Sequence, residues 1–185
     1  DFIGISNCLV TDLIVREVAG ENISERVTFY NQSYLNTYHS FMKIFQDQYP
    51  LMGNAPVMAA KIVWDWTIYW AITALLFFHD NKRFDPAWAA TVQDELRQFD
   101  QLNRDMQFFF QQLRYKKMDL GTQCYFDFFS FSFLEVLYFG LEAKWDGEGL
   151  RRQLKDNLAL LTSLVTSCKT KGTLPNRDGA FVFTA

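Results

Sequence analysis

The sequence predicts an all-α protein, a bundle of about five or six helices around one central apolar helix. The first basis for this prediction is the stretch from Asn54 to Asp80, whose apolar residues fall on every side of a helix, so that other helices must surround it. The second is that apolar residues recur at spacings of three and four on both sides of this stretch. No internal repeat or linker rich in Gly, Ser or Pro divides the chain, which predicts one helical domain over residues 1–185 with a tail at 173–185.

Two helices are predicted before the central one. The first runs from Asn7, an N-cap residue, to Gly20, which suits a helix C-terminus. The second begins at Asn22, which forms a capping-box pattern with Glu25, and its apolar stripe continues to Phe45. Three tyrosines lie in this stripe, and their hydroxyls need hydrogen-bond partners.

The central helix is predicted to begin at Asn54, an N-cap residue, with Pro56 in its first turn, where the missing N–H costs nothing. A transmembrane span is the alternative. The uncharged run 66–78 is shorter than the roughly 18–20 residues that a bilayer requires, and Lys61 and Asp65 interrupt its upstream extension. A core helix that solvent hardly reaches is therefore favoured.

Two further long helices are predicted downstream. Asp85 followed by Pro86 has the cap-then-proline pattern of a helix start, and an apolar stripe covers 88–113. Asp146 is the expected cap of the last helix, which Gly172 ends.

The segment 125–144 is ambiguous, because residues 129–133 alternate between Phe and Ser like a strand, whereas the apolar length suits a helix. A helix is predicted, since a lone strand in a helical chain would lack a partner. The tail after Gly172 is expected to add one short strand or to pack Phe181 and Phe183 onto the body.

Charge and cysteine content argue against nucleic-acid binding and against a disulfide framework. The net charge is −3 and no basic tract is interleaved with aromatics, so the sequence has no electrostatic footprint for nucleic acid. Cys8, Cys124 and Cys168 are widely spaced, without a CxxC motif, which predicts reduced thiols in a cytoplasmic protein.

Catalytic and metal-binding motifs are also missing. His39 and His79 are the only histidines, and neither belongs to the Glu-x-x-His motif of a di-iron bundle, so no metal site is expected. There is no GxSxG, GxGxxG or P-loop, and no catalytic residue is assigned.

Asp65 and Glu135 lie in apolar helices, where each could be an acid or base in a pocket. The favoured alternative pairs Asp65 with Lys61 and Glu135 with an arginine or a backbone amide, inside the core.

Aromatic residues make up 17% of the chain and suit either a core or the wall of an apolar pocket. Tryptophans and a tyrosine cluster within two turns of the central helix and do not share one face. Core packing is favoured, with a substrate-lining role as the alternative. The candidate lining residues are Trp64, Trp66, Tyr69, Trp70, Phe129 and Phe131.

Three stretches, DFIGISNCLVTDLIVREVAGE, RVTFYNQSYL and DQYPLMGNAPVMAAKIVWDWTIYW, resemble the C-terminal half of the flavin-dependent halogenases and their FAD-dependent oxidoreductase relatives, the tryptophan halogenase-like family. The resemblance implies a largely helical region that covers the substrate side and follows the flavin-contacting loop, which would place Asp1 and Phe2 nearest the flavin. The family's dinucleotide fingerprint and catalytic lysine would both lie upstream of Asp1. The run from Trp64 to Tyr69 looks like the family's W-x-W-x-I-P motif, but Tyr69 replaces the proline, and no role is assigned to it.

The resemblance implies FAD as the cofactor of the full-length protein, not bound by this chain alone. The implied partners are the FAD-binding N-terminal portion of the same protein, an apolar or aromatic small molecule, and a flavin reductase. A helical module that stands alone and binds an apolar ligand, a partner or a membrane surface is the alternative.

Overall fold

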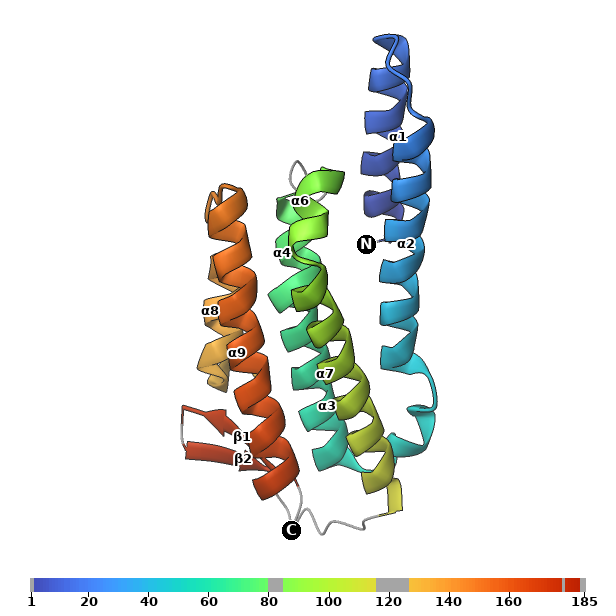
Figure 1. The fold of residues 1–185 in the computed structure, drawn as a ribbon. Coiled ribbons are helices and arrows are strands. Elements are labelled where there is room, and N and C mark those ends of the chain that lie inside the picture. Colours follow the sequence, from blue (N-terminus) through green and yellow to red (C-terminus); the bar gives the residue numbers. More distant parts are fainter. Residues whose placement is uncertain (1, 80–84, 116–126, 178, 184–185) are drawn as a thin grey trace.

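The fold is described from a computed structural model, which covers residues 2–79, 85–115, 127–177 and 179–183 (Figure 1). The all-α prediction is confirmed. Over these residues the chain forms a helical bundle, and its two strands are short and lie at the C-terminal end. In chain order the elements are α1 (Phe2–Val18), α2 (Ser24–Phe45), η1 (Tyr49–Leu51), α3 (Ala55–Ile68), the π-helix η2 (Tyr69–Ala74), α4 (Leu75–Phe78), α6 (Pro86–Thr91), α7 (Gln93–Gln112), η3 (Leu113–Tyr115), η4 (Phe128–Ser130), α8 (Ser132–Gly140), α9 (Gly147–Lys171), β1 (Thr173–Asn176) and β2 (Gly179–Val182).

Helices α1 and α2 form an antiparallel hairpin that extends past the rest of the bundle (Figure 1). Helix α1 begins at Phe2 instead of Asn7, because the Phe2 ring packs onto aromatic rings of α2. The prediction of a capping box at the start of α2 is wrong. The Asn22 side chain accepts a hydrogen bond from the Ser24 N–H at 3.1 Å, which forms a local turn, and Ile23 occupies the cap position without a side-chain bond.

The hairpin has a small core of its own, formed by Ile5, Leu9 and Tyr30. The buried Tyr30 hydroxyl donates to Asp12 Oδ2 at 2.6 Å and accepts a bond from Arg26 at 3.2 Å, so at this tyrosine the predicted hydrogen-bond partners are present. The larger core of the body is a separate cluster. The hairpin and the body therefore have different apolar centres.

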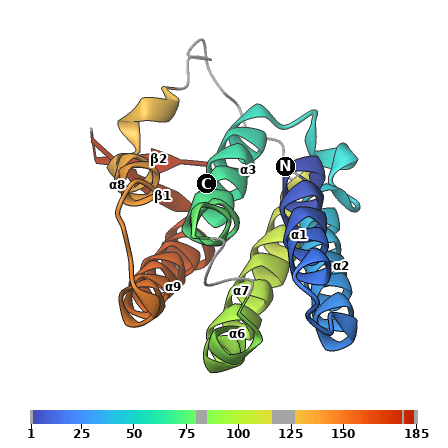
Figure 2. The same ribbon diagram turned by 90° about the horizontal axis from the view of Figure 1, so that it is seen from above.

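Helices α3, η2 and α4 together form the predicted central helix, and Asn54 caps it by accepting the Val57 N–H at 3.4 Å. The expectation that solvent hardly reaches it is wrong, because Ile62, Trp66 and Phe78 are exposed. Seen from above, α3 lies between α8 and the hairpin, with α7 and α9 on one side of it (Figure 2).

The stretch Ala55–Phe78 is also long and apolar enough to cross a membrane, judged by length and composition alone. Half of its most apolar window is buried inside the bundle, and a buried core helix passes the same test. No other helix in the described part of the chain meets these criteria.

The predicted caps of the later helices are confirmed. The Asp85 side chain accepts the N–H two residues ahead at 2.9 Å, and Asp146 accepts the N–H three residues ahead at 2.6 Å. Gly172 ends α9 in the left-handed conformation, with φ of 62°. The third long helix is not continuous, because Val92 leaves helical geometry between α6 and α7.

The helix predicted over 125–144 is much shorter in the structure, and residues 125 and 126 lie outside the described part of the chain. Asp127 caps a 3-10 turn, η4, by accepting the Phe129 N–H at 2.9 Å. Phe131 is extended, and only Ser132–Gly140 is α-helical. The alternation of Phe and Ser thus marks a turn followed by a short helix.

The tail forms an antiparallel hairpin in which Leu174 faces Phe181. The two strands pair with each other, which removes the objection to a strand in a helical chain. Phe183 follows β2, is fully buried and packs on the rings of Phe109 and Phe110 of α7. The tail was expected to add one short strand or to pack its phenylalanines onto the body. It forms two short strands, and Phe181 and Phe183 also pack onto the body core.

Candidate functional site

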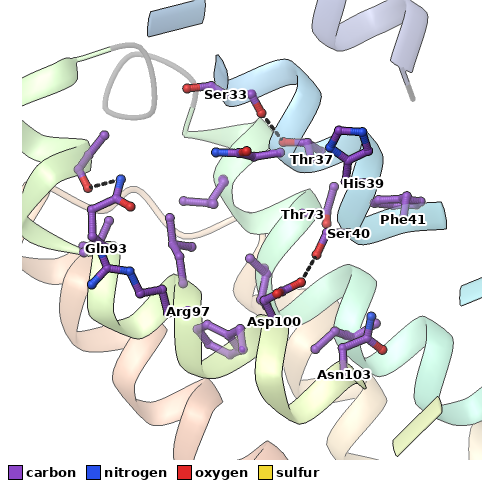
Figure 3. Close-up of a pocket in the computed structure, with 18 of the residues that line it drawn as sticks. Ser33, Thr37, His39, Ser40, Phe41, Thr73, Gln93, Arg97, Asp100 and Asn103 are labelled. Carbon is purple, nitrogen blue, oxygen red and sulfur yellow. Dashed lines mark hydrogen bonds between the residues drawn. The ribbon is translucent and has the colours of Figure 1, made fainter. Parts of the chain in front are cut away.

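A cleft of about 370 Å³ separates α2 from the helices η2, α6 and α7 (Figure 3). Its volume lies in the range of small-molecule sites. Its floor is apolar and includes Ile68, Ile72 and Leu76 of the central helix. Polar side chains of α2 and α7 form its rim. Those labelled in Figure 3 include Ser33, Thr37, His39, Ser40, Gln93, Arg97, Asp100 and Asn103.

The π-helix η2 lies beside this cleft. A π-helical turn has an extra residue relative to an α-helix, which rotates the side chains that follow, and such turns occur frequently at functional sites. Here Tyr69, Ile72 and Thr73 of η2 line the cleft. Within the part of the chain that the structure describes, no hydrogen-bond partner of the Thr73 hydroxyl is present.

A polar bridge joins α2 to α7 toward one end of the cleft. Asp100 Oδ1 accepts hydrogen bonds from Ser40 at 2.8 Å and from Lys43 at 2.6 Å, and Arg104 lies 3.1 Å from Oδ2. Burial alone would raise the pKa of the Asp100 carboxyl. The bonds from Lys43 and Ser40 and the charges of Lys43 and Arg104 outweigh it, so the pKa is lowered.

The lowered pKa predicts that Asp100 stabilises the fold at neutral pH and that this stabilisation is lost on acidification. A group whose pKa is lower in the folded state contributes fully above its unfolded value, about 3.9 for Asp, and loses the contribution as the pH falls through the folded value. Asp100→Asn should therefore be less stable than the parent at pH 7, and the difference should shrink below pH of about 4. Urea unfolding at a series of pH values measures it. Asp94→Asn, at an exposed position of the same helix, is the control, and a difference that stays constant with pH would contradict the prediction.

A buried polar network lies beneath the cleft, between α3 and α7. Lys61 is 4% exposed and pairs with Asp65, as predicted, and Gln107 donates to Asp65 at 2.8 Å. Asn103 accepts hydrogen bonds from Gln107 at 3.2 Å and from the Trp64 indole at 3.1 Å. Burial raises the pKa of the Asp65 carboxyl, and its bonds to Lys61 and Gln107 offset this only in part.

An aromatic face covers the exposed side of the central helix. Trp66 is 44% exposed, and its ring lies 5.7 Å from that of Tyr69, 5.3 Å from Trp70 and 6.2 Å from Phe128, measured between centroids. Trp70 in turn lies 5.3 Å from Tyr138 of α8. We call these five rings the aromatic face.

A series of ring contacts connects the aromatic face to the start of α1. The Phe2 ring lies 5.3 Å from Phe41, and Phe41 lies 6.2 Å from Tyr69. Phe41 and Tyr69 also line the cleft. The cleft and the aromatic face therefore meet at Tyr69.

The predicted lining residues separate into three groups. Trp64 and Phe131 are each 1% exposed and lie in the core, whereas Phe129 is 79% exposed and lies at the edge of the aromatic face, next to Phe128. The structure brings together Trp66, Tyr69 and Trp70, and Tyr69 alone of the six lines the cleft. Asp1 lies outside the described residues.

The histidines have ordinary structural positions. His39 is exposed at the rim of the cleft. His79 is buried, and its two ring nitrogens each lie 2.8 Å from a backbone carbonyl oxygen, of Leu75 and Ala143. No group of His, Cys, Asp and Glu in the described ranges could hold a metal ion.

Glu135 pairs with Arg177, as predicted, but both side chains are exposed, so the expected position inside the core is wrong. The reason is that Glu135 lies on the solvent side of the short helix α8.

Burial raises the pKa of the Cys168 thiol to about 12, which keeps it protonated and unreactive.

Sequence reasoning missed the bridge of Ser40, Lys43 and Asp100 and the rest of the cleft rim. Ser40 and Lys43 are separated from Asp100 by 60 and 57 residues, so no local spacing connects them. The available signal was weak. It consisted of hydroxyl side chains at helical spacing on α2, at Ser33, Thr37 and Ser40, and an entirely solvated helix face can have the same pattern.

A comparison of the chain with protein-family models, curated proteins and solved structures finds no match.

Proposed function

We propose that this chain is the helical, substrate-side domain of a cytoplasmic FAD-dependent oxidoreductase, halogenase-like or monooxygenase-like, that acts on an aromatic or otherwise apolar substrate. In this proposal the FAD-binding N-terminal portion of the same protein holds the flavin, and the reaction takes place between the two parts. The isolated chain neither binds FAD nor turns over substrate. A flavin reductase supplies reduced flavin.

The observation that carries the proposal is the series of ring contacts from Phe2 to the aromatic face. Phe2 was placed near the flavin by the resemblance, and Trp66, Tyr69 and Trp70 were candidates for substrate lining because of their aromatic character. The ring of Phe41 connects Phe2 to Tyr69 of the aromatic face. The proposal requires the flavin and the substrate to lie side by side, and this connection supports it.

The distribution of exposed apolar side chains also supports a second body against the hairpin. Of the 20 large apolar side chains exposed in the described residues, 11 lie in residues 2–52. Helix α1 packs Ile5 and Leu9 against α2, so one of its faces is already buried. Clusters of exposed large apolar side chains mark interaction surfaces more often than single ones do. The stripe on its other face consists of Ile3, Val10, Ile14 and Val18.

The test is the visible absorbance spectrum of the protein expressed from the complete reading frame of the gene, beside that of the 185-residue chain mixed with FAD. The proposal expects the bands of oxidised flavin to be retained by the full-length protein after desalting and to be lost from the chain. A full-length protein without these bands would refute it. A reading frame with GxGxxG upstream of Asp1 is a second expected result.

The proposed contact of α1 with the flavin-binding portion gives a sharper prediction. Ile14→Asp should leave the stability of the 185-residue chain nearly unchanged, since Ile14 is already exposed there. In the full-length protein the same change buries a carboxylate and should cost about 1–3 kcal/mol of unfolding free energy. Thermal unfolding of both proteins measures the difference. Ser163→Asp, at an exposed polar position of α9, is the control, and an equal effect of Ile14→Asp in both proteins would contradict the predicted contact.

The cleft favours a second candidate function, a helical module that stands alone and binds an apolar ligand, a partner or a membrane surface. Its volume suits a small molecule without a contribution from another domain. A colourless full-length protein and a start codon just before Asp1 are the results that this alternative expects.

A further inference from the structure

One face of α2 is exposed along its length and changes from polar to apolar. In its first half this face has Thr28 and Asn31, both exposed. The same spacings of three and four residues continue into the second half, so the side chains that follow lie on the same face. There the face has four large apolar side chains, each between 41% and 60% exposed. These four, which we call the α2 stripe, are Leu35, Tyr38, Met42 and Phe45.

The spacing of the α2 stripe is that of a coiled-coil seam, with successive steps of three, four and three residues. The order of these steps reads the same from both ends. If two copies of α2 lie antiparallel about a twofold axis, Leu35 of one copy therefore faces Phe45 of the other, and Tyr38 faces Met42. Such a contact uses the same surface on both copies, which is the usual arrangement in homodimers.

The charges around the α2 stripe suit contact with a copy of itself. A twofold contact brings identical groups close together, so ionised side chains in it would repel each other. Residues 32–46 contain one residue of the Lys, Arg, Asp and Glu types, Lys43. Its ammonium donates to Asp100 of α7 at 2.6 Å, so it is directed toward the body. The exposed flanking residues Asn36 and Gln46 are amides, which can both donate to and accept from a second copy.

The area of the α2 stripe is sufficient for a weak dimer. A large apolar side chain has roughly 200 Å² of surface, and about half of it is exposed at each position, so the stripe offers roughly 400 Å² per copy. Apolar patches of about 300–600 Å² are often functional. A standard interface buries about 800 Å² per partner, twice as much. A dimer held mainly by the α2 stripe should therefore dissociate in the micromolar range or above.

We propose that two copies of this chain associate through their α2 stripes, as an antiparallel pair of α2 helices related by a twofold axis. The inference goes beyond the proposed function and does not depend on it. The α2 stripe shares no residue with the exposed side chains of α1, on which the proposed contact with the flavin-binding portion depends.

Sedimentation equilibrium of the 185-residue chain, from low micromolar to millimolar concentration, tests the association. The mass should rise with concentration from the 21.7 kDa of one chain toward twice that value. Met42→Glu places a carboxylate within the contact and should weaken the dimer by about a hundredfold or more. Thr28→Glu is the matched control. It adds the same charge to the polar half of the same face, outside the paired segment 35–45, and should leave the association unchanged.

Two further variants test the antiparallel pairing. Leu35→Glu and Phe45→Lys each place a charge opposite an apolar side chain of the second copy, so each variant alone should remain monomeric. In an equal mixture the introduced carboxylate of one variant faces the introduced ammonium of the other, and the dimer should form again. A parallel pair would not bring these two positions together, so the mixture would remain monomeric.

Circular dichroism shows that each variant retains the helical fold, as expected for exposed positions. A parent chain that stays monomeric at every concentration would overturn the proposal, and so would equal association of Met42→Glu and the parent. Absence of a dimer in the mixture of Leu35→Glu and Phe45→Lys would overturn the antiparallel arrangement. These results are independent of the visible spectrum of the full-length protein, so failure here and failure of the flavoprotein proposal are distinguishable.

Discussion

Replacing Asp65 with alanine is expected to lower the free energy of unfolding by about 3–5 kcal/mol, because it leaves the Lys61 ammonium buried without a counter-charge. Lys61 is only 4% exposed. Asp65 also accepts a hydrogen bond from Gln107, so the change removes an acceptor from a second buried side chain. Urea denaturation at neutral pH measures the effect.

The double variant Lys61→Met, Asp65→Leu is the matched control for this prediction. It removes both charges and fills the same space with apolar atoms, and such replacements of buried ion pairs are often neutral or stabilising. Its unfolding free energy should therefore exceed that of Asp65→Ala, with a remaining deficit of at most about 1–3 kcal/mol for the acceptor that Gln107 loses in both variants. A double variant as unstable as Asp65→Ala would show that packing, and not the unpaired charge, causes the loss.

Replacing Phe183 with alanine is expected to destabilise the protein by about 3–5 kcal/mol, the usual cost of deleting a fully buried phenylalanine. The ring has no solvent exposure and contacts the rings of Phe109, Phe110 and Phe181. Chemical denaturation followed by circular dichroism at 222 nm, roughly the helix band, reports the loss.

Val182→Ala controls for a general weakening of the tail, because Val182 precedes Phe183 and is 55% exposed. Its expected cost is within about 0.5 kcal/mol. If both substitutions cost the same, the tail would act through its strand pairing, and the burial of Phe183 would contribute nothing of its own.

Features set by short-range interactions could be predicted from the sequence. The caps at Asn54, Asp85 and Asp146 and the stop at Gly172 depend on hydrogen bonds and backbone angles within a few residues. Asn22 does not form the predicted capping box, although Glu25 lies at the position that the pattern requires. A different local bond, to Ser24, satisfied its side chain instead.

Features set by tertiary packing could not be predicted in this way. Trp64 and Trp66 are two residues apart in the same helix and have the same chemistry, yet one lies in the core and the other on the aromatic face. Which face is covered depends on where α7 and α8 lie, and no local pattern contains that information. The π-helical geometry of η2 and the break at Val92 are further products of packing.

The same reasoning applies to the candidate site. The buried Lys61–Asp65 pair was predicted because both residues lie one turn apart on one helix. The cleft was not predicted, because its two walls come from α2 and α7 and meet only in the folded chain. Tyr69 was identified as an aromatic residue, but its position between the cleft and the aromatic face required the structure.

The burial of Phe183 against α7 has a consequence for biosynthesis. Phe109 and Phe110 leave the ribosome some 70 residues before the ring that covers them, since translation is vectorial. During that interval the faces of Phe109 and Phe110 that Phe183 later contacts are uncovered. The body can complete its packing only once residue 183 has emerged, whereas the α1–α2 hairpin, with its separate apolar centre, can form early in translation.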